Sequence, residues 1–100
     1  MLREDFVIQT NIRRILIRSN VDYSGITFGT VRGVVYIQGI FKLSGVSTLV
    51  GSKEEEDFIS KSLRSFELKV RSIPGVVDVR FQFRNWKKEK GQWLRTRLTE

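Results

Sequence analysis

Two segments of the chain repeat their apolar residues at the spacing of an α-helix. In the first, from Asp5 to about Ile17, apolar positions recur every three or four residues, and arginines fall on the other side. The second begins with Ser52-Lys53-Glu54-Glu55, which is typical of a capping box, and ends at Pro74-Gly75. We therefore predict two amphipathic helices. Their apolar faces comprise Ile8, Ile12, Ile15 and Leu16 in the first, and Ile59, Leu63, Phe66, Val70 and Ile73 in the second.

Three other segments alternate apolar with small or polar residues, as β-strands do. The first is Ile26–Thr30, the second runs from Val34 to about Leu43, and the third is Val76–Arg84. Arg32-Gly33 predicts either a two-residue hairpin turn or a bulged variant, because arginine is a poor choice for a positive φ. In the third strand, Val77, Val79, Phe81 and Phe83 are expected to face the helices.

The residues after Trp86 leave two structures open. Lys87–Gly91 reads as a polar loop, and Gln92–Thr99 alternates once more. This last stretch is either a fourth strand paired with the third, with Leu94 and Leu98 inward, or a frayed tail.

The predicted fold class is α/β, an α+β sandwich with the order αββαβ. Two helices pack on one face of a three-stranded mixed sheet, with or without a fourth C-terminal strand. A right-handed crossover through the second helix makes the third strand parallel to the second. The prediction is a single domain over 1–100, with a core at about 5–84 and a basic, aromatic extension at 85–100.

The composition removes most common catalytic chemistry. The chain has 100 residues, 40% of them hydrophobic, and contains neither histidine nor cysteine. An imidazole base, a thiolate nucleophile, a disulfide framework and the usual zinc ligands are therefore excluded. We expect no catalytic residues, no metal site and no cofactor, and we infer no small-molecule substrate. The start of the chain resembles neither a signal peptide nor a membrane span, so the expected location is cytoplasmic.

The positive charge is concentrated near the end of the chain. The formal net charge is +7, from 18 Lys and Arg against 11 Asp and Glu. Between Arg80 and Arg97 there are seven cations and one acid, a net of +6, whereas the remainder nets +1. This imbalance favours a binding module with an acidic partner.

Strand parity predicts where this charge lies. If the apolar residues of the third strand face the helices, its polar residues point to the opposite, open face of the sheet. The predicted binding residues on this face are Tyr36, Arg80, Arg84, Trp86, Lys87, Lys88, Lys90, Trp93, Arg95 and Arg97. A basic surface with interleaved aromatics fits anionic lipid headgroups or single-stranded nucleic acid. Alternatively, the two tryptophans pair across a hairpin and the lysines form a solvated turn.

The order of elements and several short motifs resemble the BON domain, a small α/β module of bacterial envelope and osmotic-stress proteins. The matching residues are Asp5, Ile8, Ile12 and Leu16 in the first helix, Ile26, Phe28, Gly33, Val35, Ile37 and Gly39 in the hairpin, and Gly75, Val76 and Val79 before and in the last strand. The resemblance implies a non-catalytic module that associates with phospholipid membranes or serves in attachment. At Gly39, we expect the missing side chain to let a helix approach the sheet closely.

Three functions therefore remain open. The leading one is a BON-like module attached peripherally to anionic phospholipid through the basic face. The runner-up is binding of nucleic acid through the same face. The third is a module for protein interaction or homo-oligomerisation.

Overall fold

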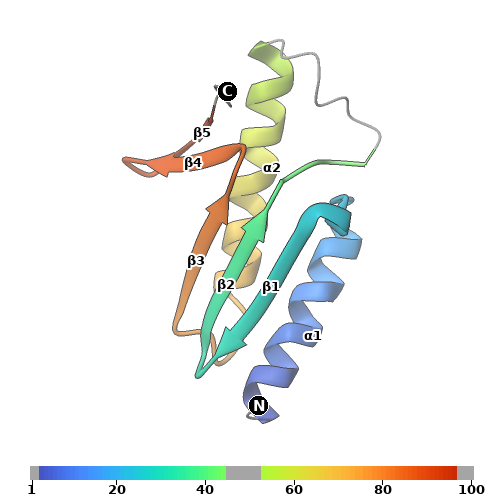
Figure 1. The fold of residues 1–100 in the computed structure, drawn as a ribbon, viewed down its shortest axis with the longest axis vertical. Coiled ribbons are helices and arrows are strands. Elements are labelled where there is room, and N and C mark those ends of the chain that lie inside the picture. The colour runs from blue at the N-terminus through green and yellow to red at the C-terminus, as the bar shows by residue number, and fades with distance from the viewer. Residues whose placement is uncertain (1–2, 45–52, 97–100) are drawn as a thin grey trace.

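The computed structural model describes residues 3–44 and 53–96 (Figure 1). The predicted packing of two helices with a mixed three-stranded sheet is confirmed. A separate two-stranded hairpin, which was not predicted, follows the sheet. The predicted capping residue Ser52 lies outside the described residues. The elements are α1 (Arg3–Arg18), the 3-10 turn η1 (Tyr23–Gly25), β1 (Ile26–Val31), β2 (Val34–Gly39), α2 (Lys53–Arg71), β3 (Asp78–Phe83), β4 (Trp86–Glu89) and β5 (Gln92–Arg95).

The three-stranded sheet has β2 in its centre. β1 pairs with β2 antiparallel, and β3 pairs with β2 parallel, so that Ile37 lies opposite both Phe28 and Phe81. The parallel direction predicted for the third strand is confirmed, and the crossover through α2 joins two adjacent strands. In Figure 1, α2 passes behind the sheet and α1 lies along β1, and no helix covers the face of the sheet turned toward the viewer. Apolar residues of both helices share one core with the inward residues of the sheet.

The core lies between the helices and the inward side of the sheet. The predicted apolar faces of both helices are buried, except that Ile15 is half-buried, and Ile12 and Leu63 are completely inaccessible to solvent. Burial of these large side chains is the dominant favourable contribution to folding, at roughly 1.5–3 kcal/mol for each. The residues that are almost fully buried are Ile8, Ile12, Leu16, Val35, Ile37, Phe41, Leu63, Phe66 and Val70.

A carboxylate from α1 caps the turn between β1 and β2. Arg32 and Gly33 have φ of 51° and 83°, and Val31 pairs directly with Val34, so the two-residue alternative is the one that forms. Asp5 is buried, and its two carboxylate oxygens accept hydrogen bonds from the backbone N–H of Arg32 at 2.9 Å and of Gly33 at 3.0 Å. These bonds offset the cost of a left-handed arginine, about 1–2 kcal/mol.

β2 ends at Gly39, earlier than the predicted boundary near Leu43. Gly39 has φ of 122°, and a Cβ built there overlaps the carbonyl oxygen of Gly25. The expectation that a helix approaches here is wrong, because the close neighbour is the backbone of η1. Beyond β2, the side-chain amide of Asn85 accepts from the N–H of Phe41 at 3.0 Å and donates to its carbonyl at 2.9 Å.

Val77 does not face the helices as predicted. Its side chain is 76% exposed, and β3 begins one residue later, at Asp78. Gly75 turns the chain with φ of 94°, and the N–H of Val77 then donates to the carbonyl of Gly33 at 2.8 Å. Side chains therefore alternate between the two faces of the sheet only from the point where β3 pairs with β2. Within β3, Val79 and Phe83 are buried as expected.

The C-terminal residues form a hairpin of their own instead of a fourth strand of the sheet. The predicted loop over Lys87–Gly91 contains most of β4 and a turn at Lys90-Gly91, whose φ values are 51° and 77°. β4 and β5 pair antiparallel with each other, and neither pairs with β3 (Figure 1). The Ser60 hydroxyl of α2 donates to the Trp93 carbonyl at 3.1 Å, which ties the hairpin to the helix.

Candidate functional site

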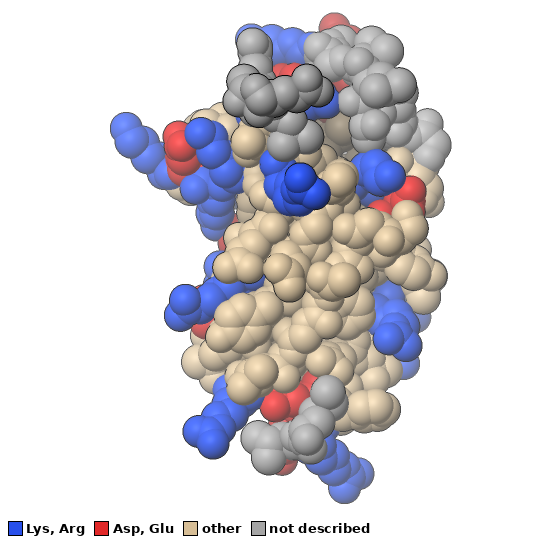
Figure 2. Space-filling model, viewed as in Figure 1, with Lys and Arg blue, Asp and Glu red and all other residues tan. Residues whose placement is uncertain are grey.

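The open face of the sheet consists of the side chains of β1, β2 and β3 that point away from the helices. Tyr36 lies at its centre, between Gly29 of β1 and Arg80 of β3. In Figure 2 this side of the molecule presents an uncharged expanse, with many Lys and Arg side chains and fewer Asp and Glu side chains around its margin. Apolar residues contribute to this expanse, since Val31 is 60% exposed and Tyr36 is 39% exposed. The open face is therefore a partly apolar surface with a cationic margin.

Two predicted binding residues, Arg80 and Arg84, belong to the β3 side of the sheet. β3 is an edge strand, and Arg84 directly follows it. Arg80 is exposed, and its guanidinium lies 3.8 Å from the Asp78 carboxylate. Both side chains are largely in water, so this pair is weak and leaves Arg80 available to an external anion. Arg84 is also exposed and makes no ion pair among the described residues.

The hairpin holds four more of the predicted cations, and three of them have internal partners. Lys87 pairs with Glu89 at 2.9 Å, and Arg95 lies 3.7 Å from Glu56 of α2. Lys88 contacts the buried Glu67, whereas Lys90, at the turn, makes no ion pair among the described residues. The basic segment is therefore partly compensated by carboxylates from α2 and from the hairpin itself. Arg97 lies outside the described residues.

The predicted exposure of both tryptophans is wrong. Trp86 and Trp93 are only 4% and 6% exposed, whereas Leu94, predicted inward, is 40% exposed. The ring of Trp93 meets Phe81 edge to face, with centroids 5.3 Å apart. The two tryptophans predicted to point outward from the hairpin therefore point inward, and Leu94 points outward. The reason is that the apolar face of the hairpin packs onto α2 and β3 instead of extending the sheet. Trp86 lies opposite Arg95 and Trp93 opposite Lys88, so the two indoles are not cross-strand partners.

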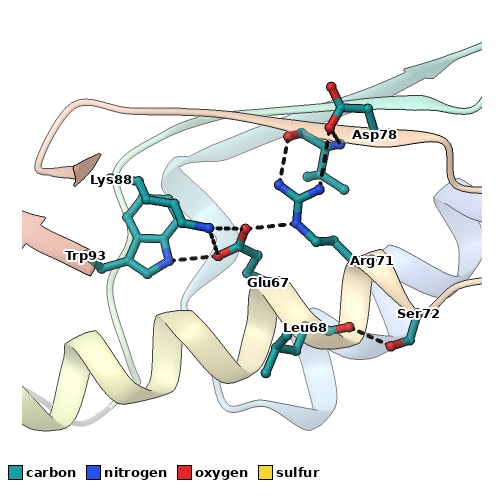
Figure 3. A network of polar contacts seen from close by, with 8 residues as sticks. Glu67, Leu68, Arg71, Ser72, Asp78, Lys88 and Trp93 are labelled. Carbon is teal, nitrogen blue, oxygen red and sulfur yellow. Dashed lines mark hydrogen bonds and ion pairs between the residues drawn. The ribbon is translucent and has the colours of Figure 1, made fainter. Parts of the chain in front are cut away.

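Glu67 joins the hairpin to α2 in a network that pattern reading did not find (Figure 3). Its side chain is 5% exposed and accepts from Lys88 Nζ at 2.7 and 2.9 Å, from Arg71 Nε at 2.8 Å and from Trp93 Nε1 at 3.1 Å. Arg71 also lies 3.4 Å from Asp78, which connects the network to β3. A sequence signal exists, because Glu67 follows Leu63 by four residues and therefore lies on the apolar face of α2.

The hydrogen bonds keep Glu67 charged. Burial alone raises the pKa of the Glu67 carboxyl, but hydrogen bonds from Lys88, Arg71 and Trp93 outweigh burial, and the net pKa lies below its usual range. In return, the hydrogen bond to Glu67 raises the pKa of the Arg71 guanidinium. The carboxylate is saturated with donors, and its effect is to hold the hairpin in place.

An open cleft of about 330 Å³ adjoins this network. Aromatic side chains from β3 and the hairpin form its floor, and Glu67, Arg71, Lys87 and Lys88 supply its polar lining. Among residues 3–44 and 53–96, no group of three or more acidic side chains gathers as metal ligands would. In the same residues, no helix combines the length and the apolar character needed to cross a bilayer.

The chain was compared with protein-family models, curated proteins and solved structures, and none of them matches it.

Proposed function

We propose that the protein is a non-catalytic, BON-like module that attaches to anionic phospholipid surfaces through the open face of its sheet. The observation that supports this most is the combination of an uncharged, partly apolar centre with Lys and Arg side chains around it (Figure 2). The interfacial region of a bilayer accepts exposed apolar and tyrosine side chains, while the lipid phosphates attract the arginines around them. The proposed location is the cytoplasmic surface of a membrane.

The positions of the aromatic residues favour lipid over single-stranded nucleic acid. Nonspecific binding of single strands relies on exposed aromatic rings that stack with successive bases. Both tryptophans are buried, and Tyr36 is the one aromatic side chain that the described sheet residues present outward. A single ring does not make a stacking platform.

The cations of the site are expected to differ in their contribution. Arg80 and Arg84 contribute most, since one has only a weak surface partner and the other has none among the described residues. Lys88 contributes least, because both oxygens of Glu67 already hold its ammonium group. Each exposed cation near an anionic surface contributes about 1 kcal/mol of attraction.

The proposal is tested by co-sedimentation with vesicles of phosphatidylglycerol mixed with phosphatidylcholine, over a salt series and with excess single-stranded DNA as competitor. We expect binding that weakens with salt and persists in the presence of DNA. The double variant Arg80→Gln/Arg84→Gln should bind about 30-fold more weakly, the equivalent of about 2 kcal/mol.

A matched control removes the same charge from the helices. Arg13→Gln/Arg64→Gln replaces two exposed arginines of α1 and α2 that make no ion pair among the described residues. This control should bind vesicles nearly as well as the unmodified protein. Equal losses in both variants would remove the open face as the site. Release of the vesicles by DNA would favour nucleic acid, and binding to neither would favour protein interaction.

A further inference from the structure

The seam between α1 and α2, on the side of the helices away from the sheet, carries a second group of cations. Two open hollows lie along it, one of about 310 Å³ and one of about 350 Å³, and Lys69 lines both. Arg14 and Arg18 of α1 line the first hollow, and Lys61 of α2 lines the second. We refer to Arg14, Arg18, Lys61 and Lys69 as the seam cations.

The seam cations differ from those of the hairpin in lacking internal partners. None of the four makes an ion pair among the described residues, and no Asp or Glu lines either hollow. By contrast, carboxylates compensate Lys87, Lys88 and Arg95 in the hairpin. Four uncompensated cations around two hollows that share Lys69 create a positive potential that an anionic ligand would neutralise.

Several polar but neutral groups of the seam suit the same chemistry, although Ile15, Ile73 and Pro74 also line the first hollow. Ser19, Ser62 and Ser65 line the second hollow together with Phe58, and the buried hydroxyl oxygen of Ser19 has no hydrogen-bond partner among the described residues. A buried hydroxyl without a partner is costly, and rotation of the Ser19 side chain toward the hollow would let a ligand oxygen satisfy it. Ser72 and Asn11 line the first hollow. Hydroxyls, arginine forks and lysine ammonium groups together form a typical environment for phosphoryl oxygens.

We propose that the helix seam is a binding site for a ligand that carries more than one phosphoryl group. Arg14 and Arg18 contact one phosphoryl group in the first hollow, Lys61 and Ser19 contact another in the second, and Lys69 contacts both. This site is separate from the open face of the sheet. Because both helices cover the same side of the sheet, a module that lies on a membrane through its open face presents the seam to the solution (Figure 1).

The test uses the full chain and two soluble probes, pyrophosphate and inositol hexakisphosphate, measured by isothermal titration calorimetry at physiological ionic strength. The seam variant is Arg14→Gln/Lys69→Gln. Its matched control is Arg13→Gln/Arg64→Gln, which removes the same charge from the same two helices outside both hollows. Circular dichroism of each variant verifies that the helices are intact. We expect the seam variant to lose at least about 10-fold in affinity for inositol hexakisphosphate, and the control to lose less than about threefold.

Two further arms identify the source of the phosphoryl groups and separate this proposal from the previous one. Arg80→Gln/Arg84→Gln should keep the affinity for the soluble probes, and the seam variant should keep binding to phosphatidylglycerol vesicles. If the seam variant loses vesicle binding instead, the phosphates that bind there belong to lipid headgroups, and the proposed orientation on the membrane is wrong. Equal losses in the seam variant and its control, or no binding of either soluble probe, would overturn the seam site.

Discussion

Replacing Glu67 with glutamine is expected to loosen the hairpin. The substitution keeps the shape of the side chain and an oxygen for the Trp93 indole, but it removes the charge that Lys88 and Arg71 share. A hydrogen bond to a charged group contributes about 1.5–3 kcal/mol when it is shielded from solvent. Here the side chains of Lys88 and Arg71 are 40% and 41% exposed, so water takes over part of their solvation. We therefore expect a loss of about 2 kcal/mol in the free energy of unfolding.

Urea denaturation followed by tryptophan fluorescence measures this loss where it occurs. The two tryptophans of the chain, Trp86 and Trp93, are both in the hairpin. A loss of about 2 kcal/mol corresponds to a drop in melting temperature of about 10 °C for a domain of this size. The matched control is Glu89→Gln, which breaks the exposed pair with Lys87 and should cost less than about 0.5 kcal/mol. Similar losses in both variants would refute the structural role assigned to Glu67.

Three further predictions concern pH and the backbone. The first concerns Glu67, whose folded-state pKa lies below the ordinary value of 4.5. Its ionised form therefore stabilises the fold above pH 4.5, and this contribution is lost as the pH falls through the folded-state pKa. The stability difference between Glu67→Gln and the unmodified protein should therefore be full near neutrality and shrink in acid; a pH-independent difference would contradict this. Asp5→Ala leaves two backbone N–H groups of the turn without their acceptor and should lower the free energy of unfolding, measured by urea denaturation, by about 2–4 kcal/mol. A loss below about 0.5 kcal/mol would contradict this role of Asp5. Gly39→Ala brings a Cβ onto a carbonyl oxygen and should lower the free energy of unfolding, measured by thermal denaturation, by about 3 kcal/mol or more. Gly91→Ala, with open space around it, should lower it by about 1 kcal/mol. Equal losses in the two variants would argue against the close approach at Gly39.

The helices and the three-stranded sheet were predictable because each buries one face over many residues. A repeated apolar face such as that of Leu63 and Phe66 can be buried in only one way, and the pattern therefore specifies the element and its orientation. Asp5 was recognised as part of a motif, but its role as the cap of a turn 27 residues away depends on how α1 packs against β1.

The hairpin was not predictable to the same degree. Each of its strands has four residues, and either parity would leave a mixture of apolar and polar side chains on both faces. Contact with α2 and β3 decides which face is buried, and that contact includes Glu67, which lies 21 residues before Lys88 and 26 before Trp93. The predicted strand parity therefore holds for Tyr36 and Arg80, which are register partners on one face of the sheet, but it is wrong for both tryptophans.

The contact between the open face and a lipid surface can be measured directly, because the chain has no cysteine and a single introduced one is labelled uniquely. An environment-sensitive fluorophore is attached in one protein at Gln38→Cys, on the open face, and in another at Thr10→Cys, on the exposed surface of α1. With phosphatidylglycerol vesicles, the proposed function predicts a blue shift and increased emission for the label at position 38, and no change at position 10. A shift confined to position 10, or none at either position while the protein sediments with the vesicles, would contradict the proposed function.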